Sequence, residues 1–236
     1  MKLIINNLKM NLTLPEIINY ESELSNIETN NKIVICPSFP YLTHFKSNNY
    51  YLGSQNVSHI KEGSLTGEVS AKQLKSLDVK YTIVGHSERK EKLLEDNNQI
   101  TEKIKLLFEN DICPVLCIGE LSKANLNIEN EIKENLEDIF RSINNINNIV
   151  IAYEPVWAIG TGIIPDNSHI GNNISIIKKW FKDKYNTDIK VIYGGSVNTS
   201  NITSLNNISN LDGYLLGGTS LNINLLKEII KYTEVQ

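Results

Sequence analysis

Residues that can transfer protons or hold an anion follow short apolar segments at several points of this sequence. Asn7 and Lys9 follow the first such segment, His86 follows a later one, and Glu154 directly follows another. A carboxylate and an imidazole can exchange protons with a bound molecule, while an ammonium and an amide can stabilise its negative charge. Glycine-rich turns, whose backbone N–H groups can bind an anion, contribute Gly160, Ser196, Gly217 and Gly218.

Each of these features also has a purely structural interpretation. Glu154 could form an ion pair at a strand end, His86 could be a core histidine, and Lys9 could be a solvated side chain beside a turn asparagine. The glycines could serve ordinary turns. The choice depends on whether the fold brings these residues to one place.

The elements that would position these residues include eight predicted strands. Several of the segments, such as 81–84 and 149–153, lack the polar alternation of a half-exposed strand. Continuous apolar strands are typical of a parallel sheet covered by helices. The predicted strands are 2–6, 32–36, 51–55, 81–84, 112–117, 149–153, 190–193 and 214–216.

Helical patterns alternate with these strands. The first opens with a capping box at 13–16, and we expect it to bury Ile17, Ile18, Leu24 and Ile27. Another helix is expected to begin near residue 87. Further helices are predicted at about 97–110, 129–143, 170–185 and 220–232.

This alternation, without a linker rich in Pro, Gly or Ser, predicts an α/β protein with one domain over residues 1–236. Eight strand–helix units favour a closed (β/α)8 barrel of parallel strands, in which catalytic groups lie past the carboxyl ends of the strands. An open doubly wound sheet stays an alternative. No G-x-G-x-x-G follows the first strand and no G-x-x-x-x-G-K-[ST] occurs, which argues against dinucleotide and P-loop sites.

Charge and composition argue against several classes of partner. The chain has 23 Lys and Arg against 27 Asp and Glu, without a basic run, so we expect no nucleic-acid binding. The N-terminal apolar run is too short for a signal peptide, and no stretch approaches the roughly 18–20 apolar residues of a membrane span. We therefore expect a soluble cytoplasmic protein with no membrane partner. Cys36, Cys113 and Cys117 are expected to be buried thiols rather than disulfides or metal ligands.

Taken together, the motifs resemble the triosephosphate isomerase family over essentially the whole chain. The segments around His86 and Glu154 are highly specific, whereas Gly217-Gly218 alone is weak. The resemblance implies a (β/α)8 TIM barrel that interconverts dihydroxyacetone phosphate and D-glyceraldehyde 3-phosphate in glycolysis and gluconeogenesis, with neither cofactor nor metal. The resembling segments are 7–11, 66–68, 84–89, 117–120, 152–162, 193–197 and 216–218.

The resemblance also implies a role for each candidate residue. Glu154 is expected to move a proton between adjacent carbons, and His86, as a neutral imidazole, to polarise the carbonyl oxygen of an enediolate-forming substrate. Lys9 is expected to hold the ligand's negative charge and Asn7 to donate a hydrogen bond to its oxygen. Backbone N–H groups are expected to bind the phosphate at Gly160, Ser196, Gly217 and Gly218.

Two positions depart from the family's pattern. Leu8 stands where the family usually has Trp, and Ile163 stands where Lys often follows the Gly-Thr-Gly of a lid. The turn at 155–157 and the glycines after it predict that lid, which would desolvate Glu154 when it closes. Neither departure removes a reacting group.

The segment 56–70 is long for a connection without clear periodicity. The resemblance implies a homodimer in which this segment inserts into a neighbouring subunit. Thr66 is then expected to approach Asn7 and Lys9 of the partner subunit, and Glu68 to pair with Arg89 across the two-fold interface.

Two other functions stay open as alternatives. The barrel could act on another small sugar phosphate, or it could bind a phosphate without catalysis. The joint presence of Lys9, His86 and Glu154 argues against the first alternative, and the presence of both the base and the expected lid argues against the second.

Overall fold

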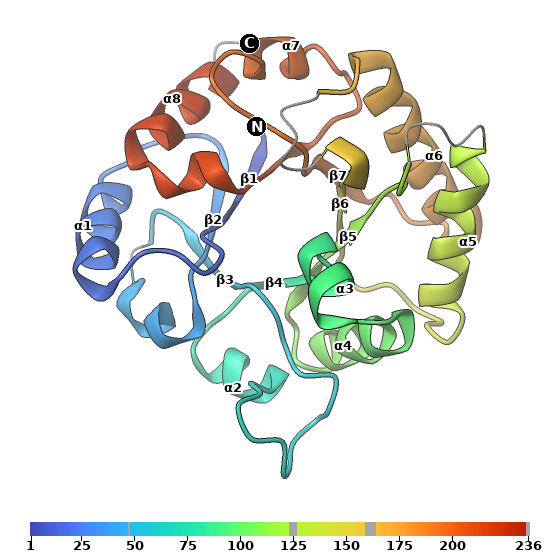
Figure 1. Ribbon diagram of the computed structural model, residues 1–236, viewed down its shortest axis with the longest axis horizontal. Helices are drawn as coiled ribbons and strands as arrows, with labels where there is room; N and C mark the ends of the chain where they lie inside the picture. Colours follow the sequence, from blue (N-terminus) through green and yellow to red (C-terminus); the bar gives the residue numbers. More distant parts are fainter. Residues whose placement is uncertain (47, 123–126, 159–163, 235–236) are drawn as a thin grey trace.

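The barrel closes because its parallel strands pair in sequence order. The computed structural model describes residues 1–46, 48–122, 127–158 and 164–234, and in it the last strand pairs back with the first. This order confirms the predicted (β/α)8 barrel and excludes the open doubly wound sheet (Figure 1). The strands within the described residues are β1 (Leu3–Asn7), β2 (Lys32–Cys36), β3 (Tyr51–Ser54), β4 (Tyr81–Val84), β5 (Cys113–Ile118), β6 (Val150–Tyr153), β7 (Lys190–Tyr193) and β8 (Gly213–Leu216).

The predicted strand bounds are confirmed for β2, β4 and β7 and differ by one residue at the ends of the others. The difference arises because backbone pairing, rather than the apolar run, decides where a strand ends. Asn7, for example, pairs in register with Cys36, so β1 continues one residue beyond its predicted end at residue 6.

Side chains along each strand alternate between the barrel interior and the surrounding helices. Ile5 and Val34 belong to a buried cluster inside the barrel. Ile4 and Ile33 belong to a larger cluster that also contains helix residues such as Ile17. Because side chains fill the interior, a ligand can enter only at an end of the barrel.

Helices surround the barrel, as Figure 1 shows. Two of them, α2 and α7, are absent from the sequence prediction because six and five residues are too few to display a helical period. The described helices are α1 (Leu14–Ser25), α2 (Ala71–Ser76), α3 (Ser87–Leu93), α4 (Asn97–Glu109), α5 (Ile128–Phe140), α6 (Asn167–Tyr185), α7 (Ile202–Asn206) and α8 (Ile223–Glu234), with 3-10 turns η1 (Phe39–His44), η2 (Val156–Ala158) and η3 (Gly218–Leu221).

Several details of the helix prediction are wrong. Ile27 lies beyond the end of α1 at Ser25 and is only partly buried, and α5 ends at Phe140 rather than residue 143. Ile18 is 53% exposed, because it lies about 100° around α1 from the buried Ile17. Helix α6 begins at Asn167 rather than near residue 170, because the Asp166 side chain caps it. Helix α8 begins at Ile223 rather than 220, because η3 occupies the preceding residues.

The three cysteines are buried and unpaired, on β2 and β5, as predicted. Burial raises the pKa of the Cys36 thiol and that of the Cys117 thiol well above the usual range of a cysteine thiol. A thiol that stays protonated is a poor nucleophile and a poor metal ligand. Among the described helices, none is both long and apolar enough to cross a membrane.

Candidate active site

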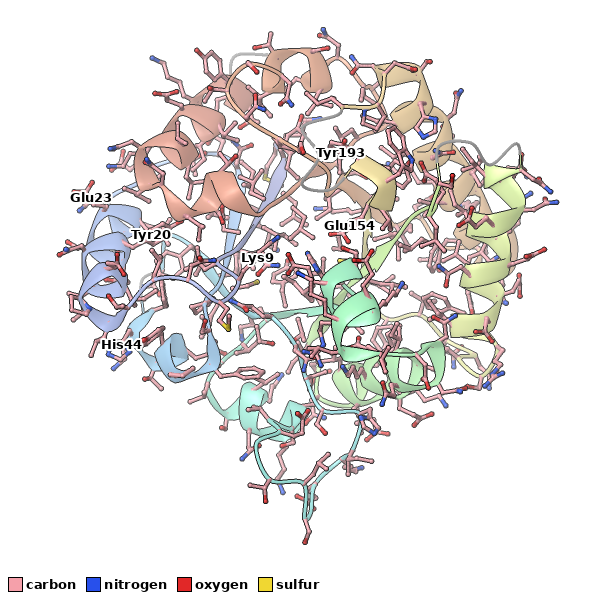
Figure 2. The ribbon with its side chains drawn as sticks, in the orientation of Figure 1. Lys9, Tyr20, Glu23, His44, Glu154 and Tyr193 are labelled. Atoms are coloured by element: carbon pink, nitrogen blue, oxygen red, sulfur yellow. The ribbon has the colours of Figure 1, made fainter. Side chains whose placement is uncertain are left out.

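The closed barrel brings most of the predicted site residues to one end. Each lies at or just past the carboxyl end of a strand, and together they line a cavity of about 520 Å³. Figure 2 places Lys9 and Glu154 within the ring of helices and Glu23 and His44 at its periphery. Gly160 lies outside the described residues, as does Ile163. The predicted residues that line the cavity are Asn7, Lys9, His86, Glu154, Ser196, Gly217 and Gly218.

Lys9 is held in an unusual backbone conformation. Its φ of 52° lies in the left-handed region, which is uncommon for a residue other than glycine and often marks a functional site. The Asn7 side chain accepts a hydrogen bond from the Lys9 amide at 3.0 Å. The Lys9 carbonyl accepts from Ser38 Oγ at 3.0 Å and from Gln55 Nε2 at 2.8 Å. These contacts offset the strain and aim the lysine into the cavity.

The sequence prediction missed Glu88, which pairs with Lys9. Its Oε1 lies 2.6 Å from Lys9 Nζ, and both side chains are partly exposed. Burial raises the pKa of the Glu88 carboxyl, but the hydrogen bond from Lys9 and the positive charges of Lys9 and Lys92 oppose this effect, so the pKa lies below its usual value. Its position in the first turn after His86 is the sequence signal that would have pointed to it.

His86 lies at the N-terminus of α3, where it caps the helix. Its Nδ1 accepts a hydrogen bond from the Glu88 backbone amide at 3.3 Å, so that nitrogen carries no proton. With Nδ1 as the acceptor of this bond, the ring N–H lies on Nε2, which is 3.5 Å from Glu154 Oε1.

Glu154 is 2% exposed and directly follows β6. Its amide donates to the Ile118 carbonyl at 2.8 Å, which continues the ladder between β5 and β6. Two glycines make room for it. A Cβ on Gly119 would come within 1.9 Å of the Glu154 carbonyl oxygen, and a Cβ on Gly194 within 2.7 Å of its Cγ. Close packing therefore holds the carboxylate opposite His86.

The turns after β7 and β8 form another part of the cavity wall, and the turn after β7 packs against Glu154 at Gly194. Thr219 Oγ1 donates to the Val197 carbonyl, which ties the two turns together. Ser220 Oγ lies within hydrogen-bond distance of the carbonyls of Asn7 and Gly217, so the β8 turn also joins β1. A Cβ on Gly217 would lie 3.1 Å from Lys9 Cε, because the lysine stem rests on this turn. Lys9 thus contacts both the Glu88 carboxylate and the turn after β8.

In the described part of the chain, no group of three or more His, Cys, Asp or Glu side chains is arranged to hold a metal ion. The cavity lining includes the buried Glu154 carboxylate, the His86 imidazole and the Lys9 ammonium, together with the turns after β7 and β8. Such an arrangement can move a proton next to a carbonyl in a small anionic compound.

Comparison with known proteins agrees with this geometry. A family model described as Triosephosphate isomerase matches residues 2–233. This chain belongs to the triosephosphate isomerase family. A triosephosphate isomerase of Mycoplasmopsis pulmonis is 35% identical, over 99% of this chain and 98% of that protein. Those of Buchnera aphidicola and Neurospora crassa are 38% and 39% identical, covering 97% and 91% of this chain and 98% and 92% of the relatives.

One departure from the family's pattern is visible in the structure. Leu8 is fully buried in the cluster between barrel and helices, and its amide donates to the Cys36 carbonyl at 3.1 Å. It therefore supports the backbone beneath Lys9 by packing.

Proposed function

We propose that the chain interconverts dihydroxyacetone phosphate and D-glyceraldehyde 3-phosphate by proton transfer through an enediolate. The observation that supports this most directly is the pair formed by Glu154 Oε1 and His86 Nε2, 3.5 Å apart at the cavity that Lys9 also lines. A base and a hydrogen-bond donor side by side are what a proton shift between adjacent carbons requires.

Glu154 takes the proton from the carbon next to the carbonyl, and the electron pair of that C–H bond moves towards the carbonyl oxygen. His86 donates its Nε2–H to this oxygen as negative charge develops. Glu154 then returns its proton to the former carbonyl carbon. The hydroxyl proton on the other oxygen passes to the first oxygen, beside His86, and a new carbonyl forms on the carbon that lost its proton, which gives the isomer. The buried position of Glu154 keeps bulk water away from its carboxylate.

Lys9 supplies the positive charge for the substrate. Without ligand its ammonium pairs with Glu88, but both side chains are partly exposed, at 29% and 39%. An exposed pair of this kind is worth only about 0–1 kcal/mol, so an anionic ligand can displace Glu88 at little cost. Asn7 contributes by fixing the Lys9 backbone and, in this proposal, by a hydrogen bond to a substrate oxygen.

The phosphate is assigned to the turns that carry Ser196, Gly217 and Gly218, with Gly160 as the fourth expected contact. Backbone N–H groups in glycine turns bind phosphate without a basic patch, and barrels commonly bind it after the seventh and eighth strands. Lys9 rests on Gly217, so this assignment places the ammonium between the phosphate and the reacting carbons.

Turnover tests this function directly. The purified protein should form glyceraldehyde 3-phosphate from dihydroxyacetone phosphate, measured with a coupled dehydrogenase. A Glu154→Gln sample purified identically controls for isomerase from the expression host. Equal rates in the two samples would reject the assignment. Action on a different sugar phosphate, or anion binding without turnover, would support one of the alternatives.

We also propose a homodimer formed through residues 56–70. A groove of about 700 Å³ beside the site is lined by Met10, Phe39 and Leu93 together with Glu68 and Arg89. Met10 is 95% exposed, which is unusual for a large apolar side chain and suits a face that another subunit covers. In one chain Arg89 pairs with Glu95, and the proposed contact with Glu68 of a partner subunit would add to that pair.

A further inference from the structure

A second buried carboxylate lies close to the site but takes no part in the chemistry above. Glu120 is fully buried, two residues after β5. Its Oε1 accepts from Trp157 Nε1 at 2.9 Å and lies 2.9 Å from His169 Nε2. The Tyr153 hydroxyl lies 3.0 Å from both carboxylate oxygens. Three side chains from β6, η2 and α6 thus converge on one carboxylate.

The donor and acceptor roles follow from the chemistry of these groups. A carboxylate can only accept, so the proton of the His169 ring lies on Nε2 and points to Glu120. Burial and the neighbouring Glu120 charge raise the pKa of the Tyr153 hydroxyl, so it also stays a donor. Asn173 Nδ2 donates to the Tyr153 oxygen at 2.7 Å, which leaves the Tyr153 hydrogen for Glu120.

His169 has a distinct place among these donors. Among the described residues it is the one basic side chain within 4 Å of Glu120. A buried carboxylate is costly unless hydrogen bonds or an opposite charge compensate it. The backbone that carries the ring is also held in place, because Asp166 Oδ1 accepts a hydrogen bond from the His169 amide at 2.8 Å in the first turn of α6. His169 is therefore placed to decide where the Glu120 carboxylate lies.

Glu120 in turn holds the turn that follows the proposed base. Its carbonyl accepts from the Val156 amide at 3.0 Å, and its side chain binds Trp157 in η2, three residues after Glu154. The Trp157 and His169 rings meet edge to face, with centroids 6.1 Å apart. Displacement of the carboxylate would thus move the backbone immediately after Glu154.

We propose that His169 is a positioning residue for the reaction. Its bond to Glu120 fixes the carboxylate that binds Trp157 and Val156, and through them the turn that sets the position of Glu154. This inference rests on the proposed function. It concerns the placement of the base, since His169 does not touch the cavity residues that bind substrate.

Two substitutions of His169 introduce the same polar amide group but differ in whether its nitrogen can come within hydrogen-bond distance of Glu120. In His169→Gln the amide nitrogen can take the place of Nε2 and still donate to Glu120. In His169→Asn the side chain is one methylene shorter, so its nitrogen falls near the place of Nδ1 and does not reach. Both replacements are polar amides at a half-buried position in the first turn of α6, so both should fold. Circular dichroism and thermal unfolding check this.

Two readouts are measured on each variant: kcat and KM for dihydroxyacetone phosphate, and Trp157 fluorescence in a Trp180→Phe background, which leaves one tryptophan of the two. We expect His169→Asn to lower kcat roughly 10-fold, because small misplacements of a reacting group are costly, with KM little changed. Its Trp157 emission should shift, and His169→Gln should restore both values.

Different failures can be told apart. If the parent turns over substrate and His169→Asn has the same kcat and the same Trp157 emission, the inference is wrong and the proposed function stands. Equal loss in His169→Gln and His169→Asn would also overturn it, since reach would then not matter. An inactive parent would reject the proposed function, and the catalytic part of this inference with it.

Discussion

Replacing the proposed base is the most direct perturbation of this site. Glu154→Gln keeps the volume that packs against Gly194 but removes the ability to accept a proton. A positioned general base speeds the chemical step by roughly 10²–10⁴-fold. We therefore expect kcat of Glu154→Gln to fall by roughly this factor, while KM changes little. This corresponds to about 3–5 kcal/mol of transition-state stabilisation.

Glu154→Asp tests the geometry separately from the chemistry. The carboxylate stays basic but withdraws by about one C–C bond, roughly 1.5 Å, from its place 3.5 Å from His86 Nε2. Misplacement of a reacting group by about 1 Å can cost around 10²-fold, so this variant should lie between the parent and Glu154→Gln. Steady-state kinetics in both directions, with thermal unfolding as the control for folding, measure both effects. Near-normal turnover by Glu154→Gln would refute the assignment of the base.

Three further outcomes are expected. His86→Gln should slow turnover less than Glu154→Gln, because an amide can still donate to the developing oxyanion; an unchanged kcat would remove His86 from the mechanism. Glu95→Gln should destabilise the fold by about 3–5 kcal/mol at pH 7, because it leaves the 3% exposed Lys103 ammonium without its carboxylate at 2.7 Å. Burial raises the pKa of the Glu95 carboxyl, but the charges and hydrogen bonds of Lys103 and Arg89 outweigh this effect, so the pKa in the folded protein is lowered. The ion pair therefore stabilises the fold fully above the pKa of the unfolded state, and this stabilisation is lost as pH falls through the pKa of the folded state. In urea unfolding, the difference in free energy of unfolding between the parent and Glu95→Gln should therefore become smaller below about pH 4. A difference that does not change with pH would contradict the ion pair. Shortening residues 58–66 should give a monomer by light scattering with most activity lost through a displaced Lys9, whereas a fully active monomer would show that association does not organise the site.

Local patterns in the sequence predict much of the architecture. Apolar runs and capping residues predict the strands and the longer helices to within a few residues, because each depends on neighbours in the chain. The order of polar residues after strands then indicates Asn7, Lys9, His86 and Glu154, since parallel strands must present their carboxyl ends together. The barrel, and the gathering of these four side chains at one end of it, were therefore predictable from the sequence.

Tertiary structure alone decided how these groups are held. The pair between Lys9 and Glu88 joins residues 79 positions apart, and the bond between His169 and Glu120 joins residues 49 positions apart. The left-handed backbone of Lys9 is likewise set by contacts from β2 and β3 neighbours, including Gln55. Local propensity carries no information about such partners, because each contact exists only once the closed barrel has brought distant strands side by side.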